Sequence, residues 1–222
     1  MTPLRIALLG AESSGKSTLS QALADALAAR GLAVRLVPEW LRTWCLQAGR
    51  TPRPDEQMGI ARHHAGLLDQ AAAALDGPAV LIADTTPLMV AVYSDLLFGD
   101  PSLYDFALQH QRRYHATLLM GLDLPWVADG ALRDGPHVQA PVDAKVRAAL
   151  QRAGIPFQVV YGHGPARLAR AERALHGLAG PVPRPDDAPP PPSGDGPAWA
   201  CDCGSDAGCE HRLFQRLLGG AA

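Results

Sequence analysis

The sequence predicts an α/β fold in three layers, built on a parallel sheet of five strands, because two patterns alternate along the chain. Short apolar runs rich in Val, Ile and Leu, each closed by Gly, Pro or a carboxylate, are typical of buried strands. Longer segments with helical spacing or helix punctuation lie between them. Strands that alternate with helices are joined by right-handed crossovers, which gives a parallel sheet covered on both faces.

The elements are expected in a regular order. The strands are expected at LRIALLG (4–10), AVRLVPE (33–39), AVLIADT (79–85), ATLLMGL (116–122) and FQVVYG (157–162). The helices are expected at 17–30, ending at Gly31; at 39–48; at 54–75; at 87–113, with breaks near Gly99; at 142–153, ending at Gly154; and at 164–178. A glycine after the last apolar position is a common helix stop.

The composition changes after the last helix. Residues 181–198 contain eight of the twenty prolines in the chain, a composition typical of a stiff linker. Residues 199–222 regain apolar residues and carry three of the four cysteines. We therefore expect a main domain at 1–180, a Pro-rich linker at 181–198 and a small Cys-rich tail at 199–222.

Charge and hydropathy argue against two classes of partner. The net charge is −2 and the pI is about 6.4, so no broad basic surface for nucleic acid or an anionic membrane is indicated. No apolar run is long enough to span a bilayer, and the N-terminal run suits a buried strand better than a signal peptide. We expect a soluble, cytoplasmic protein with reduced thiols, whose cysteines are candidates for metal binding or burial.

The segment GAESSGKS, residues 10–17, matches the phosphate-binding pattern G-x-x-x-x-G-K-[ST] directly after a predicted strand and before a predicted helix. Its backbone amides would surround the phosphates of ATP, and Lys16, one of only two lysines, would reach the β- and γ-phosphates. The hydroxyl of Ser17 would bind Mg²⁺. The predicted nucleotide-binding residues are Gly10, Glu12, Ser13, Ser14, Gly15, Lys16, Ser17 and Thr18. The chain is thus predicted to be a P-loop NTPase.

Asp84 closes the third strand, where P-loop proteins carry a second carboxylate for Mg²⁺. The alternative is a helix N-cap for the segment that begins at Pro87. Thr85 follows, where ATPases that drive motion usually carry a glutamate that activates water. This favours phosphoryl transfer to a bound acceptor over hydrolysis.

Glu39 ends the second strand at the edge of the sheet where such folds bind ligands. Glu39 or Asp84 could act as the catalytic base for an acceptor hydroxyl, and Arg42 follows one helical turn later. The alternative is a first-turn glutamate that favours the helix dipole beside a solvated arginine. Trp40 and Trp44 are one turn apart and would either stack on a substrate ring or pack in the core.

The loop DLPWVADGALRDGP, 123–136, follows the fourth strand, where P-loop kinases carry a mobile lid. Arg133 is the candidate to close on the phosphates and exclude water, the alternative being a solvent-facing side chain.

Four segments, GAESSGKSTL, PEWLRTW, IADTTPL and PWVADGALRD, together resemble the nicotinamide riboside kinase domain of the NAD-biosynthesis regulator NadR and related bacterial P-loop ATPases and kinases. The resemblance covers roughly residues 4–178. It implies transfer of the γ-phosphate of ATP to the 5′-hydroxyl of nicotinamide riboside, and it carries Glu39, Arg42, Asp84, Asp129 and Arg133 over by position. Ala11, Thr86 and Ala131 depart from the family pattern; Thr86 stands where the family has a second aspartate. The adenylyltransferase and DNA-binding halves of the bifunctional proteins have no counterpart.

Cys201, Cys203, Cys209 and His211 form C-x-C-x₅-C-x-H in the tail, a set that could hold a structural Zn²⁺. The alternatives are free thiols or an oxidised pair. Cys45 is expected to be a buried small hydrophobe, and His63 and His64 to lie on a helix surface.

Two functions follow from these features. The first is an ATP- and Mg²⁺-dependent kinase of a nucleoside-like acceptor, with nicotinamide riboside as the leading candidate. The second is a nucleotide-dependent switch that binds a protein partner, with the tail as a possible contact for that partner or for a homo-oligomer.

Overall fold

The computed structural model describes residues 2–127 and 135–176, all within one compact unit, Met1–Arg184. The five strands are β1 (Leu4–Leu9), β2 (Ala33–Val37), β3 (Ala79–Asp84), β4 (Ala116–Met120) and β5 (Gln158–Val160). All pair in parallel, in the order β2-β3-β1-β4-β5. The predicted parallel five-stranded sheet is confirmed.

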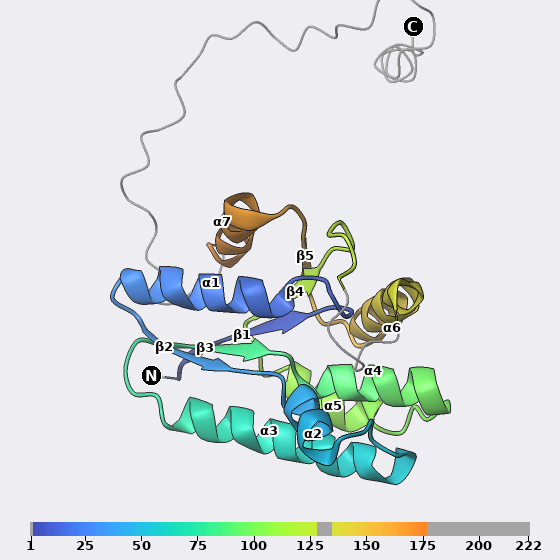
Figure 1. The fold of residues 1–222 in the computed structure, drawn as a ribbon. Helices are drawn as coiled ribbons and strands as arrows, with labels where there is room; N and C mark the ends of the chain where they lie inside the picture. The colour runs from blue at the N-terminus through green and yellow to red at the C-terminus, as the bar shows by residue number, and fades with distance from the viewer. Residues whose placement is uncertain (1, 128–134, 177–222) are drawn as a thin grey trace, which may run out of the picture. The chain divides into compact units, whose positions relative to one another are not determined.

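Helices cover both faces of this sheet (Figure 1). The α-helices are α1 (Lys16–Ala29), α2 (Trp40–Ala48), α3 (Gln57–Ala73), α4 (Pro87–Phe98), α5 (Tyr104–Gln111), α6 (Gln139–Arg152) and α7 (Gly164–Leu175). Short 3-10 turns, η1 (Pro54–Glu56) and η2 (Pro136–Val138), precede α3 and α6. The expected segment 87–113 is two helices, because Gly99 adopts the left-handed conformation, φ 66°, that ends α4.

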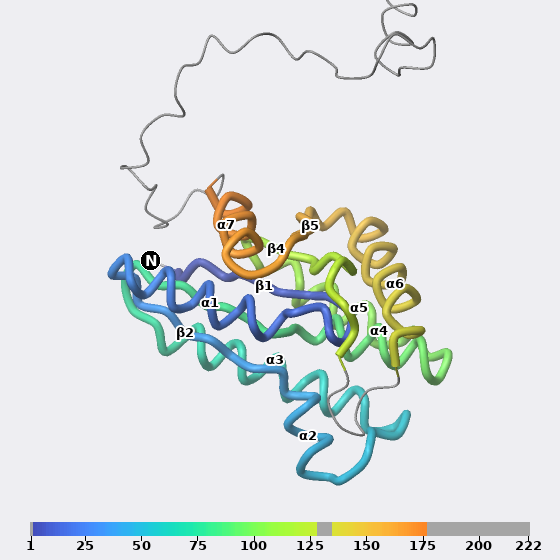
Figure 2. The backbone as a smooth tube through the Cα atoms, turned by 45° about the horizontal axis from the view of Figure 1, so that its top comes forward, coloured from blue at the N-terminus to red at the C-terminus, as the bar shows by residue number. Residues whose placement is uncertain are grey.

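Alternation along the strands divides the core into two sides. Leu8 packs with α1 and α7, whereas its neighbour Leu9 packs with α3, α4, α5 and α6. Successive side chains of a strand point to opposite faces, so one apolar run supplies both cores. Figure 2 shows α1 and α7 on one side of the sheet. The sheet is therefore the middle of three layers.

The parallel register brings the carboxyl ends of the central strands to one edge. Leu8 of β1 is paired with Asp84 of β3 and with Leu118 of β4. The loops after these strands therefore meet beside the segment that joins β1 to α1, which is the edge where open α/β sheets bind ligands.

One expectation about the helices is wrong. His63 is exposed as expected, but His64 is fully buried at 0% exposure, on the face of α3 that also carries buried Leu68.

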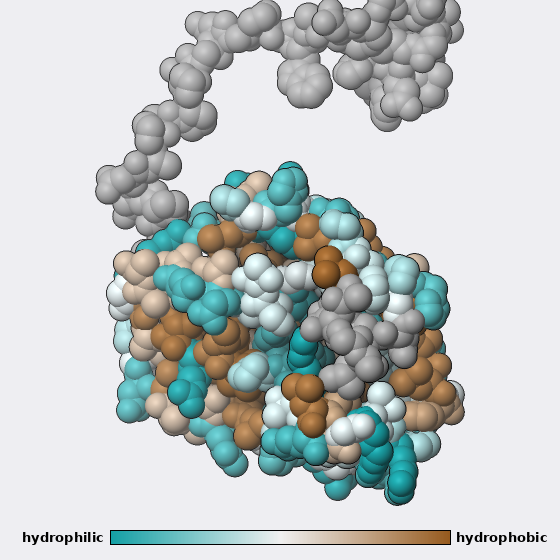
Figure 3. All heavy atoms as spheres, in the orientation of Figure 1, coloured by the Kyte–Doolittle hydropathy of each residue, from teal (hydrophilic) through white to brown (hydrophobic). Residues whose placement is uncertain are grey.

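Cys45 is buried, as expected, and burial raises the pKa of its thiol, with Glu39 adding to the effect. No described helix is both long and apolar enough to cross a bilayer. Polar and apolar patches alternate on the face shown in Figure 3.

Candidate functional site

The predicted phosphate loop lies between β1 and α1 and needs its glycines. Gly10 has φ 148°, and a Cβ atom there would lie 2.9 Å from the Cβ of Met120. Gly15 has φ 78° and caps the N-terminus of α1. Ser13 also has a positive φ, 53°. Glycine enters such conformations at the least cost, and a Cβ at residue 10 or 15 would also meet a neighbouring side chain, so the loop depends on both positions being glycine.

Internal hydrogen bonds hold the loop closed. The Ser14 hydroxyl donates to the carbonyl of Ala11 at 2.6 Å, and the Lys16 ammonium donates to the same oxygen at 2.8 Å. Both side chains are buried. The charge of Lys16 is therefore directed across the loop, where it would meet an anion that the loop encloses.

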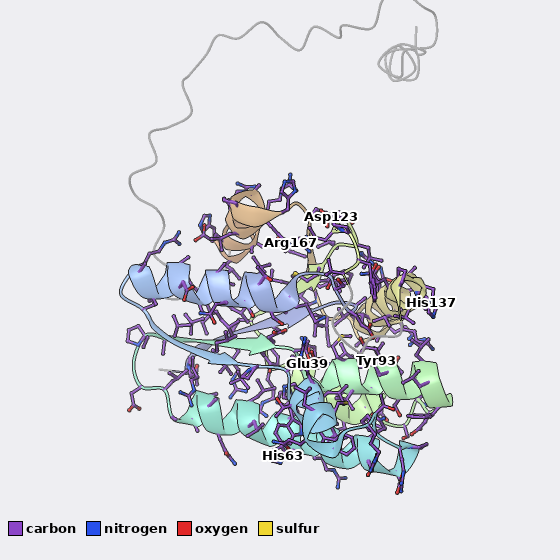
Figure 4. The ribbon with its side chains drawn as sticks, in the orientation of Figure 1. Glu39, His63, Tyr93, Asp123, His137 and Arg167 are labelled. Carbon is purple, nitrogen blue, oxygen red and sulfur yellow. The ribbon has the colours of Figure 1, made fainter. Side chains whose placement is uncertain are left out.

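A cavity of about 240 Å³ opens beside the loop and collects most of the predicted site. It is lined by Glu12, Ser13, Ser14, Gly15, Lys16, Ser17, Thr18, Glu39, Leu41, Arg42, Cys45, Thr51, Pro52, Gln57, Tyr93 and Leu97. The phosphate loop, the start of α2, the turn before α3 and one face of α4 thus share one hollow. Figure 4 shows Glu39 and Tyr93 at the edge of the sheet between α2 and α4.

Asp84 lies at the end of β3 and is 3% exposed. Its Oδ1 atom is buried without a hydrogen-bond partner in the described part of the chain. The N-cap alternative belongs to Thr86 instead, whose hydroxyl accepts from the amide of Leu88. Asp84 and Ser17 line a second cavity, of about 340 Å³. A buried carboxylate oxygen without a donor, in a cavity that a hydroxyl also lines, fits a hard cation such as Mg²⁺.

Glu39 is the residue before α2, in an extended conformation, and its side chain does not cap that helix. It lines both cavities, as Arg42 does. The first cavity therefore brings Glu39, Arg42 and Ser17 together with the rest of the phosphate loop. The second cavity brings the same three residues together with Asp84.

The structure places the two tryptophans elsewhere. The Trp40 ring packs on His63, with centroids 4.3 Å apart, and the Trp44 ring lies 5.1 Å from the guanidinium carbon of Arg50. Neither residue lines the cavities, and both pack against the core on the α3 side. This arrangement matches the core-packing alternative.

Thr86, which departs from the family pattern, faces the interior. Its hydroxyl donates to Gln111 at 2.6 Å, and Gln111 donates in turn to Thr117 at 2.9 Å. All three residues are buried, and Thr86 does not line the described cavities. Thr86 therefore acts as a helix cap and a core contact at this position.

Sequence reasoning missed several residues of the first cavity, the one beside the phosphate loop. Gln57, 2% exposed, and Tyr93 reach it from α3 and α4, although neither belongs to a recognisable motif. The sequence signal for such residues is weak: a polar side chain on the helix face that is expected to be buried.

Asp129, Arg133 and the four predicted zinc ligands of the tail, Cys201, Cys203, Cys209 and His211, lie outside the described residues. Among residues 2–127 and 135–176, no group of three or more His, Cys, Asp and Glu could hold a metal ion.

Comparison with known families decides the membership of the chain. The family described as an AAA domain matches residues 5–167, well over half of the sequence. The chain belongs to this AAA-domain family. A comparison of this AAA-domain protein with curated proteins gives no match.

Solved structures share the fold. A crystal structure of NadR in complex with NR has a TM-score of 0.66 at 15% identity and covers 82% of this chain, and one of NadR with NAD and AMP-PNP has 0.63 at 14% identity and covers 79%. The AAA-domain protein spans 53% and 49% of those chains, about half of their length. Thymidylate kinase from Ehrlichia chaffeensis gives 0.54 at 15% identity over 79% of this chain and 100% of its own. Deoxyadenosine kinase from M. mycoides gives 0.53 at 15% identity over 78% and 98%. The predicted likeness to the NadR kinase domain is confirmed at the level of fold.

Proposed function

We propose that this AAA-domain protein is an ATP- and Mg²⁺-dependent kinase that transfers the γ-phosphoryl group to a nucleoside-like acceptor, with nicotinamide riboside as the leading candidate. The observation that carries the proposal is the buried carboxylate oxygen of Asp84, which has no hydrogen-bond partner among the described residues and lies in a cavity shared with Ser17 and Glu39. A structural carboxylate at this depth would be paired, because burying an unpaired one is costly. The phosphate loop beside it supplies the matching anion site.

Each residue has a role in this scheme. The amides of the loop and the ammonium of Lys16 hold the phosphates and the charge that develops on them. Ser17 and Asp84 would hold Mg²⁺, which offsets phosphate charge when bound. Glu39 accepts the proton of the acceptor hydroxyl, with Asp84 as the second candidate base. The acceptor oxygen then forms a bond to the γ-phosphorus as the bond to the bridging oxygen of ADP breaks. Arg133 of the lid segment completes the charge coverage in this proposal.

Two features support a nicotinamide riboside acceptor. The chain resembles NadR, and one NadR structure of the same fold contains NR. The cavity also carries a carboxylate, Glu39, and an aromatic ring, Tyr93, and these groups favour a positively charged flat ring such as the pyridinium of nicotinamide riboside. Thr86, which stands where the family has a second aspartate, faces the interior, so the choice of acceptor is tested with three nucleosides.

The test is ATP consumption by the full chain with Mg²⁺, with and without nicotinamide riboside, adenosine or thymidine, and with product masses read directly. We expect an acceptor-dependent rise in ADP and a phosphorylated acceptor. Lys16→Met should lower turnover by about 10² or more, since a preorganised charge at a transferring phosphoryl group is lost. Lys145→Met is the matched control, because that lysine, in the middle of α6, pairs with Asp95 of α4 at 2.6 Å and does not line either cavity.

Background hydrolysis that no acceptor raises, combined with a rise on adding a protein partner, would favour the nucleotide-dependent switch instead. Equal turnover in the Lys16 and Lys145 variants would refute phosphate binding at the loop. These two failures are distinct, because the first concerns the acceptor and the second concerns ATP.

A further inference from the structure

Three carbonyl groups of the phosphate loop are held by side-chain donors. The carbonyl of Ala11 accepts from within the loop, as described above. The carbonyl of Glu12 accepts from the Gln139 amide at 2.7 Å, and that of Ser14 accepts from the Arg167 guanidinium at 2.9 Å. The last two donors come from α6 and α7, more than 120 residues along the chain.

These two contacts fix the direction of the loop amides. A trans peptide unit points its C=O and the next N–H in opposite directions. Holding the Glu12 and Ser14 carbonyls therefore turns the N–H groups of Ser13 and Gly15 to the other side. Gln139 and Arg167 do not line the described cavities, whereas Ser13 and Gly15 line the first one, beside the phosphate loop. The two N–H groups are thus directed to the side where an enclosed anion would lie.

Arg167 makes several hydrogen bonds besides the one to Ser14. It is 4% exposed, and it also donates to the carbonyl of Gly162 at 2.6 Å and to Asp123 at 3.2 Å. A weaker contact reaches the carbonyl of Gly121 at 3.4 Å. Figure 4 shows Arg167 and Asp123 between α7 and the loop after β4. A planar guanidinium can join the loops after β1, β4 and β5 in this way, which a single ammonium group cannot.

We propose that Arg167 and Gln139 are positioning residues for phosphate binding: they preset the loop amides for the anion without touching it. This inference rests on the proposed nucleotide binding. Preorganised donors bind more strongly because the loop need not reorder when the ligand arrives.

The test compares variants of the full chain that remove these donors with variants that remove equivalent contacts elsewhere. The test variants are Arg167→Met, Arg167→Lys and Gln139→Leu. Glu172→Gln is the control for Arg167, because Glu172 also lies on α7 and pairs with Arg30 of the turn after α1 at 2.6 Å. Gln158→Leu is the control for Gln139, because its amide contacts the carbonyl of Ala174 at 3.4 Å.

Affinity for Mg²⁺-ATP and for inorganic tripolyphosphate is measured by calorimetry, and stability by urea unfolding. We expect Arg167→Met to weaken both ligands about tenfold or more, as loss of a charged hydrogen bond does. Arg167→Lys should recover part of that loss. Gln139→Leu should weaken both about three- to tenfold, and the controls should stay within about twofold even where they lower stability.

Equal losses of affinity in test and control variants of equal stability would overturn the inference. If Arg167→Met does not fold, Gln139→Leu against Gln158→Leu decides alone, since Gln139 is an uncharged residue at the start of α6. Failure of the unmodified protein to bind ATP would instead refute the proposed function. The experiment therefore distinguishes failure of the positioning role from failure of nucleotide binding itself.

Discussion

His64 makes the stability of the protein depend on pH in a direction that the structure fixes. The side chain is fully buried on α3, and neither ring nitrogen has a hydrogen-bond partner in the described part of the chain. Burial lowers its pKa from 6.5 to about 4, and the neighbouring His110 and His63 add to this effect. The folded protein therefore disfavours the charged imidazolium, while the unfolded chain accepts a proton near pH 6.5.

The sign and size follow from proton linkage. Between pH 6.5 and pH 4 the unfolded state binds more protons than the folded state, so the free energy of unfolding falls as the pH falls. A depression from 6.5 to about 4 corresponds to about 3 kcal/mol once both states are protonated. Between pH 7 and pH 5, His64 alone should remove about 2 kcal/mol. Above pH 7 the contribution is absent.

Urea unfolding at a series of pH values measures this slope. His64→Leu should reduce it by up to one proton, while His63→Gln, the exposed neighbour that makes the smallest contribution to the lowered pKa of His64, should change it much less. His110, whose pKa burial also lowers to about 4, retains a second contribution in both variants. A slope in His64→Leu equal to that of the unmodified protein would refute the assignment of a buried, neutral imidazole.

Three further outcomes are expected. Gly10→Ala should lower stability by about 1–3 kcal/mol and weaken ATP binding, because the new Cβ meets Met120 at 2.9 Å; unchanged thermal unfolding would contradict this. Asp84→Asn should raise the Mg²⁺ concentration needed for half-maximal turnover while ATP affinity without metal changes little, and an unaltered Mg²⁺ titration would count against the metal role. Thr86→Val should cost about 1–3 kcal/mol in urea unfolding, because α4 loses its cap and Gln111 a partner; an unchanged midpoint and slope would exclude this double role.

The sequence predicted the features that depend on short segments. β1, the phosphate loop and the start of α1 occupy consecutive residues. The predicted strand and helix on either side of the motif therefore support its assignment as a phosphate loop. The edge position of Glu39 and Asp84 also followed, because parallel strands place their carboxyl ends together whatever the rest of the fold does. What these predictions share is that no partner distant in sequence needs to be known.

The remaining features depend on contacts across the chain. The apolar spacing of α3 left His63 and His64 equivalent, and only the packing of α3 shows that His64 faces inward. For Trp40 the sequence allowed both substrate stacking and core packing, and the contact of its ring with His63 depends on the packing of α2 against α3. Nothing in the sequence distinguishes Arg167 from the other arginines of α7, because its guanidinium bonds to carbonyl groups about 150 and 50 residues earlier in the chain.

Asp84 shows how the two kinds of information combine. The sequence offered two roles for this carboxylate, a metal ligand or a helix cap, and local pattern supports both equally. The cap is provided by Thr86, two residues later, whose hydroxyl also bonds Gln111. With the cap supplied, nothing in the described fold satisfies the buried Oδ1 of Asp84. Burial of a polar atom without a partner is costly to stability, and the hydroxyl of Ser17 lines the same cavity, which is why we propose that these two side chains hold Mg²⁺.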